Sequence, residues 1–240
     1  MVAVSPRVLA TPPSTVAVSR VPARIPMERP RYIAVEGPVG AGKTVLAQAL
    51  ADRLGGRLVA EVAEENPFLR GFHADRKKYA FQAQLFFLLS RFQQQQALHQ
   101  QELFTTSTIA DYLFAKDRIF AALTLDPNEL ALYDRLYGAL GPRVVKPDLV
   151  IYLQARTEVL LQRIKRRGRA YERQIDPRYV ESLATAYNDF FFHYDETPLL
   201  VVNTSDIDLV GSEEDLEALA TVIRRHRKGT QHYLPGGHRA

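Results

Sequence analysis

The chain has 240 residues, of which 46% are hydrophobic and 24% charged, so it is long enough for one domain with a sizeable core. It contains no cysteine, which excludes disulfides, thiolate metal sites and a catalytic thiol. The formal charge of +4 divides into +3 over residues 1–30, +5 over residues 224–240 and −4 over the body between them. A net acidic body argues against a polynucleotide-binding domain.

The first 30 residues are rich in Pro, Ser, Arg and Val and show no sustained period. We expect a disordered extension, 1–30, with Met27 as an alternative start of the chain. Arg-rich, acid-poor composition also fits an organelle transit peptide, although the prolines disfavour an amphipathic helix. Since no apolar run approaches the roughly 20 residues of a membrane span, we expect a cytoplasmic protein with no membrane partner.

Further along the chain, short β-branched runs alternate with segments in which apolar residues recur at helical spacing. Strands are predicted at 31–35, 57–62, 106–113, 147–153 and 199–204. Helices are predicted at 44–54, 77–101, 114–123, 128–140, 157–168, 177–194 and 213–226. Crossover helices imply a parallel sheet with helices on both faces, a three-layer α/β fold that binds ligands at the carboxyl ends of its strands. We expect this domain to span 31–228 and a flexible tail to span 229–240.

A glycine-rich loop, "GPVGAGKT", lies between the first predicted strand and the first predicted helix and matches the phosphate-binding P-loop pattern in full. Its glycines let backbone N–H groups converge on a β-phosphate, while Lys43 reaches the β and γ oxygens and the Thr44 hydroxyl holds Mg²⁺. ATP and Mg²⁺ are therefore the predicted cofactors. The predicted nucleotide-binding residues are Gly37, Pro38, Val39, Gly40, Ala41, Gly42, Lys43 and Thr44.

Two further groups of charged residues bear on the phosphate acceptor. Acids follow the second predicted strand at Glu61, Glu64 and Glu65, and transfer to a hydroxyl needs a carboxylate to orient that hydroxyl. The sequence "RIKRRGR" ends a predicted helix, where a closing lid would bring positive charge onto ATP. These features predict a P-loop kinase fold with an Arg-rich lid.

Six motifs occur in order from about Arg31 to the last predicted helix: "EGPVGAGKT", "ENPFL", "FQAQLFFLLSR", "ADYLFAKDRIF", "PDLVIYL" and "RIKRRGRAYE". With them the chain resembles the deoxynucleoside kinase family, most closely its bacterial deoxyadenosine and deoxyguanosine kinase branch. The resemblance implies Mg²⁺- and ATP-dependent phosphorylation of the 5′-hydroxyl of a deoxyribonucleoside, in nucleotide salvage, by a homodimer. It favours purine substrates and leaves pyrimidines open.

The resemblance also assigns the reacting groups. The family's base matches Glu61, although the proline that usually follows is absent here. Glu64 and Glu65 then begin the next helix. The remaining assignments are Lys43, Arg163 and Arg167 for catalysis, Arg169 for the nucleotide, and Thr44 and Asp111 for the metal.

Three residues of the long helix match the family's base-reading positions. Gln84, Phe87 and Arg91 share a face because they are spaced i, i+3 and i+7. Arg91 lies in a largely apolar stretch and needs a partner, which the family's arrangement places at Asp117. Phe87 fits the core equally well.

The sugar contacts depart from the family pattern at one position. Glu172 matches the contact to the 3′-hydroxyl, whereas His73, eleven residues before Gln84, replaces the usual tyrosine. A histidine nitrogen can substitute for the phenol as a hydrogen-bonding group.

A larger departure follows the metal-binding acid. The family has arginine after this acid, and the chain has Tyr112 after Asp111. Lys116 or Arg118 on the next helical turn is expected to supply the missing cation, and we favour Arg118 slightly, as part of the substrate site.

Two other functions stay open on sequence alone. A nucleoside monophosphate kinase shares the fold and needs extra arginines for the acceptor phosphate, for which Arg70 and Arg76 are candidates. A non-catalytic relative would explain the changes at Tyr112 and His73, but the intact P-loop and the retained Glu61 argue against it.

Overall fold

The computed structural model describes residues 31–101, 107–173, 175–207 and 211–234. The extension expected at 1–30 lies outside these ranges, as do the last six residues of the expected tail. In the described part of the chain, every helix is too short or too polar to cross a bilayer.

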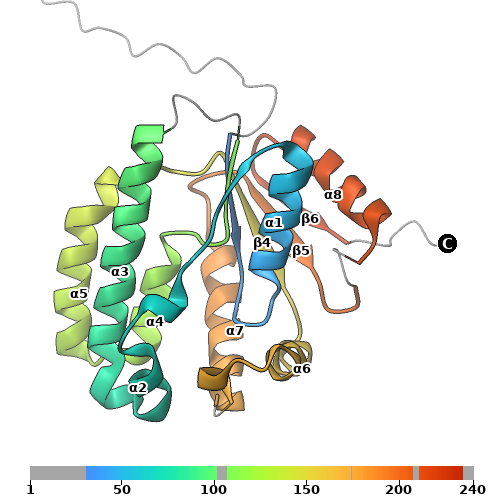
Figure 1. Cartoon of the computed structure of the whole chain (residues 1–240). Coiled ribbons are helices and arrows are strands. Elements are labelled where there is room, and N and C mark those ends of the chain that lie inside the picture. Colours follow the sequence, from blue (N-terminus) through green and yellow to red (C-terminus); the bar gives the residue numbers. More distant parts are fainter. Residues whose placement is uncertain (1–30, 102–106, 174, 208–210, 235–240) are drawn as a thin grey trace, which may run out of the picture.

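A six-stranded parallel sheet forms the centre of the molecule, with strand order β2-β3-β1-β4-β5-β6 (Figure 1). Its strands are β1 (Tyr32–Glu36), β2 (Arg57–Val59), β3 (Thr108–Ala110), β4 (Leu149–Gln154), β5 (Leu199–Asn203) and β6 (Thr230–Tyr233). Because β1 lies between β3 and β4, the loop after β1 lies where chain connections leave in opposite directions along the sheet. This switch point is where open α/β sheets bind ligands.

Helices join these strands as crossovers. They are α1 (Lys43–Leu54), α2 (Leu69–Ala74), α3 (Arg76–Gln101), α4 (Lys116–Thr124), α5 (Pro127–Leu140), α6 (Thr157–Arg167), α7 (Pro177–Phe192) and α8 (Glu213–Arg225). Three single 3₁₀ turns lie after β2, α5 and α6: η1 (Ala63–Glu65), η2 (Gly141–Arg143) and η3 (Ala170–Glu172).

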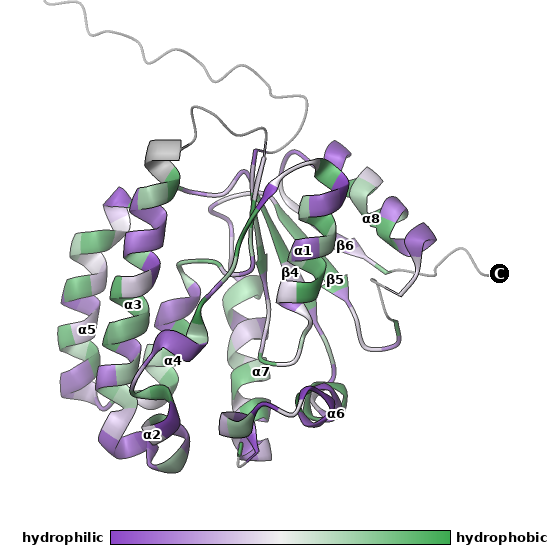
Figure 2. Ribbon diagram, in the orientation of Figure 1, coloured by the Kyte–Doolittle hydropathy of each residue, from purple (hydrophilic) through white to green (hydrophobic). Residues whose placement is uncertain are grey.

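Alternate residues of β4 and β5 enter two separate cores. On β4, Ile151 packs with α1 and α8, whereas Tyr152 packs with α4 and α7. This alternation places helices on both faces of the sheet, whose central strands are mostly hydrophobic, green in Figure 2. The predicted three-layer α/β fold is confirmed.

The sheet extends beyond the expected boundary at residue 228. Residues 230–233 form β6, which pairs in parallel with β5 from the Leu199–Thr230 register onward. The prediction of a flexible tail from 229 is therefore wrong for this segment. Its sequence, "TQHY", lacks the apolar run that marks the other strands because it is an edge strand with mostly exposed side chains.

The glycine-rich loop packs directly against the lid helix α6. Gly40 has φ +86°, and a Cβ added there would lie 2.8 Å from the carbonyl oxygen of Leu160 and 3.0 Å from Cγ1 of Ile164. Only glycine combines this left-handed backbone with such close contact. The loop and the lid are thus positioned relative to each other by backbone contact.

Gly40→Ala is expected to destabilise the protein more than Gly55→Ala. Gly55 also has positive φ, +61°, but a Cβ there meets nothing within 4 Å, so its substitution costs only the roughly 1–2 kcal/mol of left-handed backbone. Gly40→Ala adds overpacking against α6, about 1–3 kcal/mol more. Urea unfolding without nucleotide measures both, and equal losses would contradict the packing argument.

Candidate active site

The P-loop begins at the carboxyl end of β1 and folds around the Lys43 side chain. Its Nζ donates to the carbonyl oxygens of Gly37, at 2.7 Å, and Pro38, at 3.3 Å. Burial lowers the pKa of Lys43 to about 8, against the opposing effect of nearby carboxylates. A bound polyphosphate would favour the charged form, so this ammonium is placed to respond to an anion.

Asp111 joins the P-loop to the end of β2. One of its carboxylate oxygens accepts from the Thr44 hydroxyl at 2.6 Å, and the other accepts from the backbone N–H of Glu61 at 2.6 Å. The two residues predicted for the metal are therefore in direct contact. The same carboxylate also positions the residue predicted as the base.

The Glu61 carboxylate lies between two cations. Arg91 Nε donates to Oε1 at 2.8 Å and Lys116 Nζ donates to Oε2 at 2.7 Å. Burial by itself would raise the pKa of this carboxyl, but the charges and hydrogen bonds of Arg91 and Lys116 lower it well below its usual range. Glu61 is therefore a carboxylate at neutral pH, able to accept a hydrogen bond.

The residues of α3 that are predicted to read the base are buried or half-buried and lie near α4. Arg91 pairs with Asp117, which is fully buried, and its guanidinium lies 4.8 Å from the centre of the Phe87 ring. Gln84 is buried one turn before Phe87 and donates to the Thr124 hydroxyl at 3.4 Å. The predicted Arg91–Asp117 pair is confirmed, and Arg91 also binds Glu61.

The lid is held by internal ion pairs. Arg167 pairs with Glu172, with Nε 3.2 Å from Oε2. Arg169 donates to the Tyr171 hydroxyl at 2.6 Å and lies 3.3 Å from Glu64, which also accepts from Tyr171 at 3.2 Å. Glu64 does lie in a helical turn as predicted, but its side chain contacts the lid.

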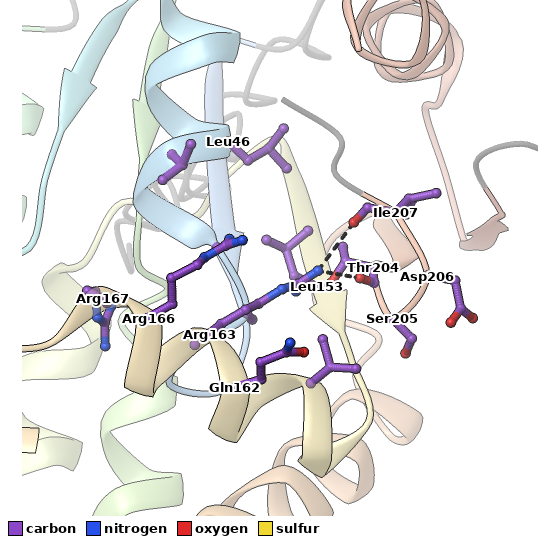
Figure 3. Close-up of a pocket in the computed structure, with 15 residues that line it drawn as sticks. Leu46, Leu153, Gln162, Arg163, Arg166, Arg167, Thr204, Ser205, Asp206 and Ile207 are labelled. Atoms are coloured by element: carbon purple, nitrogen blue, oxygen red, sulfur yellow. Dashed lines mark hydrogen bonds between the residues drawn. The ribbon is translucent and has the colours of Figure 1, made fainter. Parts of the chain in front are cut away.

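A cavity of about 560 Å³ lies between the P-loop, α6 and the loop after β5 (Figure 3). Arg163 crosses it to donate to the Thr204 hydroxyl at 3.0 Å and to the carbonyl oxygens of Thr204 and Ile207 at 2.6 and 3.2 Å. Arg166 and Arg167 lie along the same wall. In this structure the contacts of Arg163 direct it to the β5 end of the cavity, and its predicted role at the moving phosphoryl group stays a prediction.

His73 lies beside the lid, and its predicted contact to the sugar stays a prediction. Its ring stacks on Tyr171 with centroids 5.6 Å apart, next to Glu172 in sequence. Burial, followed by the charge of Arg76, lowers the pKa of His73, and its buried Nδ1 has no hydrogen-bond partner among the described residues. The lowered pKa favours the neutral ring.

Arg118 does not belong to the site, which corrects the sequence-based preference. Its side chain is 62% exposed and pairs with Asp134 on α5, with Nε 2.9 Å from Oδ1. Lys116, two residues earlier on α4, is buried and contacts Glu61 instead. Helical geometry explains the difference, since residues two apart point to different sides of α4.

Tyr112 is a core residue. Its ring is fully buried with Tyr32 and Leu98, and its hydroxyl accepts from Gln95 at 3.4 Å. The tyrosine after Asp111 therefore fills the space beneath the site and leaves the cation to Lys116.

Sequence reasoning missed Glu36, the last residue of β1. Its buried carboxylate accepts from the backbone N–H groups of Gly37, at 2.8 Å, and Leu113, at 2.7 Å, and from the Tyr187 hydroxyl at 3.1 Å. An acid inside an otherwise apolar strand is a signal that was available in the sequence.

The arginines proposed for an acceptor phosphate lie elsewhere. Arg76 stacks over the Tyr179 ring at 4.0 Å. Arg70 lines a separate cavity of about 690 Å³ between α2 and η3, together with His73 and Tyr171. Neither contributes to the network around Glu61 described above.

Arg91→Met is expected to destabilise the protein by about 3–5 kcal/mol, because it leaves Asp117 and Glu61 buried without their guanidinium partner. Adding Asp117→Asn should recover part of this loss. The matched control is Arg118→Met, which breaks an exposed pair and should cost less than about 1 kcal/mol. Urea unfolding at pH 7 gives all three values, and similar losses for Arg91→Met and Arg118→Met would rule out the buried pair as a major stabilising contact.

Comparison with known proteins gives consistent matches. A family model described as deoxynucleoside kinase matches residues 33–227. The chain is 37% identical over 198 residues to a deoxyguanosine kinase of Bacillus subtilis (strain 168), which covers 80% of this chain and 96% of that protein. It is 34% identical over 199 residues to a deoxyadenosine kinase of Dictyostelium discoideum, covering 80% of this chain and 78% of the relative.

Solved structures agree in fold. The structure of deoxyadenosine kinase from M. mycoides with products dCMP and a flexible dCDP bound superposes with a TM-score of 0.70 at 29% identity, covering 79% of this chain and 97% of that one. The dATP-bound form of the same enzyme gives a TM-score of 0.68 over the same shares. Because the family model spans residues 33–227 and the Bacillus subtilis relative is 37% identical over nearly its whole length, this protein belongs to the deoxynucleoside kinase family.

Proposed function

We propose that this kinase transfers the γ-phosphoryl group of ATP to the 5′-hydroxyl of a deoxyribonucleoside, with Glu61 as the group that orients the hydroxyl and takes its proton. The observation that carries the proposal is the shared Asp111 carboxylate, which binds both the Thr44 hydroxyl and the Glu61 backbone. It holds the acceptor-binding carboxylate at a constant position relative to the phosphate loop.

The reaction forms a bond from the 5′-oxygen to the γ-phosphorus and breaks the bond to the β,γ-bridging oxygen, releasing ADP. Phosphoryl transfer passes through a loose transition state, so positioning and charge neutralisation contribute more than base strength. This suits Glu61, whose lowered pKa makes it a weak base but a well-oriented acceptor. Lys43 faces the β and γ oxygens from the P-loop side.

The Thr44–Asp111 pair fits Mg²⁺. Both side chains offer oxygen ligands, and no group of three or more His, Cys, Asp or Glu side chains that could hold a metal occurs among the described residues. A hard cation bound by one carboxylate, one hydroxyl, water and nucleotide phosphates matches the usual Mg²⁺ site of a kinase. When bound, it neutralises phosphate charge.

The lid supplies further contacts under this proposal. Arg167 and Arg169 neutralise the transferring phosphate, and Arg163 binds the nucleotide from the cavity wall beside Thr204. Glu172 and His73 contact the 3′-hydroxyl. Their support is the clustering of Glu172, Tyr171 and His73 at one end of the lid.

The nucleobase lies against α3, with Gln84, Phe87, Arg91 and Asp117 as its recognition surface. Gln84 and Arg91 are both buried, and their amide and guanidinium groups offer paired donors and acceptors to a base edge. We propose a purine preference because several relatives are named deoxyguanosine or deoxyadenosine kinases.

A homodimer is the proposed assembly. Leu89 on α3 and Leu132 and Leu136 on α5 are 46%, 49% and 37% exposed, and the two helices pack side by side at one edge of the molecule (Figure 1). Large exposed apolar side chains grouped on adjacent helices are typical of an association surface. Light scattering of the purified protein should give twice the chain mass, and Leu132→Glu/Leu136→Glu should give the monomer mass.

A substrate panel tests the proposed reaction. Purified protein with ATP and Mg²⁺ should phosphorylate deoxyguanosine or deoxyadenosine faster than thymidine, and should leave the corresponding monophosphates unchanged. Glu61→Gln should lower kcat at least 100-fold, because the amide cannot accept the hydroxyl proton.

Glu65→Gln is the matched control, since Glu65 is an exposed acid four residues away. Unchanged turnover in Glu61→Gln would show that another group orients the acceptor. If the protein phosphorylated only monophosphates, the acceptor would be a nucleoside monophosphate and the proposed nucleoside acceptor would be wrong.

A further inference from the structure

Lys116 is a buried lysine between the carboxylate of Glu36, at the end of β1, and that of Glu61, just after β2. The residue is 2% exposed, although lysine normally keeps its ammonium in water. Its Nζ is 2.7 Å from Oε2 of Glu61 and 3.8 Å from Oε2 of Glu36. Burying an ammonium costs several kcal/mol unless partners compensate, so both carboxylates are required for this position to be stable.

The two partners connect different parts of the site. Glu36 is immobilised by the N–H groups of Gly37 and Leu113 and by the Tyr187 hydroxyl. Its carboxylate is therefore part of the base of the P-loop. Lys116 links this fixed carboxylate to Glu61, whose position at the end of β2 is otherwise supported from the α3 side.

The first turn of α4 controls both oxygens of Glu61. Lys116 donates to Oε2 directly, and Asp117 pairs with Arg91, which donates to Oε1. Two successive residues of one helix thus restrain the carboxylate from opposite sides. Restraint of both oxygens leaves the carboxylate one orientation, as positioned catalytic groups require.

Tyr112 supports this arrangement from below. Its buried ring centre is 5.8 Å from Lys116 Nζ, within cation–π range. The residue after Asp111 thus contributes a surface for the ammonium, and the cation itself comes from the following helix.

We propose that Lys116 is the positioning residue for Glu61, which it aligns with the P-loop through Glu36 so that the carboxylate meets the acceptor hydroxyl. This inference rests on the proposed function of Glu61. It assigns Lys116 a role in turnover beyond the neutralisation of buried charge.

Rescue by a conservative variant, together with the split between kcat and KM, separates a positioning role from a structural one. Arginine at position 116 keeps a cation beside Oε2 of Glu61, whereas methionine keeps only the bulk of the side chain. Loss of positioning lowers kcat with little change in KM for ATP, whereas a general loss of structure also weakens nucleotide binding.

The experiment measures kcat and KM at pH 7 for wild type, Lys116→Met and Lys116→Arg, with folding checked by circular dichroism. Lys116→Met should lower kcat by about 10- to 100-fold and change KM for ATP less than about threefold. Lys116→Arg should restore most of the turnover. Lys146→Met, which breaks an exposed lysine–glutamate pair, should match wild type.

A folded Lys116→Met enzyme with wild-type kcat would overturn the proposal, as would a folded Lys116→Arg enzyme that recovers no turnover. If Lys116→Met does not fold, Lys116→Gln carries the same expected loss of kcat, because it also removes the charge. Failure of the proposed function is distinguishable from this. In that case the wild type would not phosphorylate deoxyribonucleosides, or Glu61→Gln would keep wild-type kcat, whatever the Lys116 variants do.

Discussion

The charge network around Glu61 is the constraint on which the site depends. In this network Lys116 and Arg91 hold one carboxylate between them, and Glu36 and Asp117 hold the two cations from the far sides. Alternating charges make the burial of each member tolerable, while removal of any one leaves its neighbours uncompensated. The network therefore joins β1, β2, α3 and α4 into one rigid unit around the acceptor position.

Two contacts position the rest of the machinery relative to that unit. Asp111 connects the Thr44 hydroxyl to the Glu61 backbone, and Gly40 lets the phosphate loop rest against α6. The first contact holds donor and acceptor sides at constant separation. The second makes the lid helix a neighbour of the loop before any ligand contact, so lid residues begin close to the phosphates.

The lid itself is held less strongly. Arg169 and Glu64 are 38% and 55% exposed, and exposed ion pairs of this kind contribute little stability. By contrast, Glu172 is buried against Arg167 and His73 stacks on Tyr171. The difference favours rearrangement of Arg169 around a ligand while the part of the lid at Glu172 and Tyr171 stays in place.

Much was determined by the sequence alone. The P-loop motif and the alternation of apolar strands with amphipathic helices are local patterns, so they predicted the three-layer fold and the position of Lys43. The helical spacing of Gln84, Phe87 and Arg91 likewise placed them on one face, and the resemblance to the family indicated Asp117 as the partner that a buried Arg91 needs. Only the tertiary structure decided between Lys116 and Arg118, because that choice depends on which side of α4 faces Glu61. It also decided that β6 joins the sheet, that Arg163 faces Thr204 and that Glu36 belongs to the network, since each depends on partners distant in sequence that no local pattern encodes.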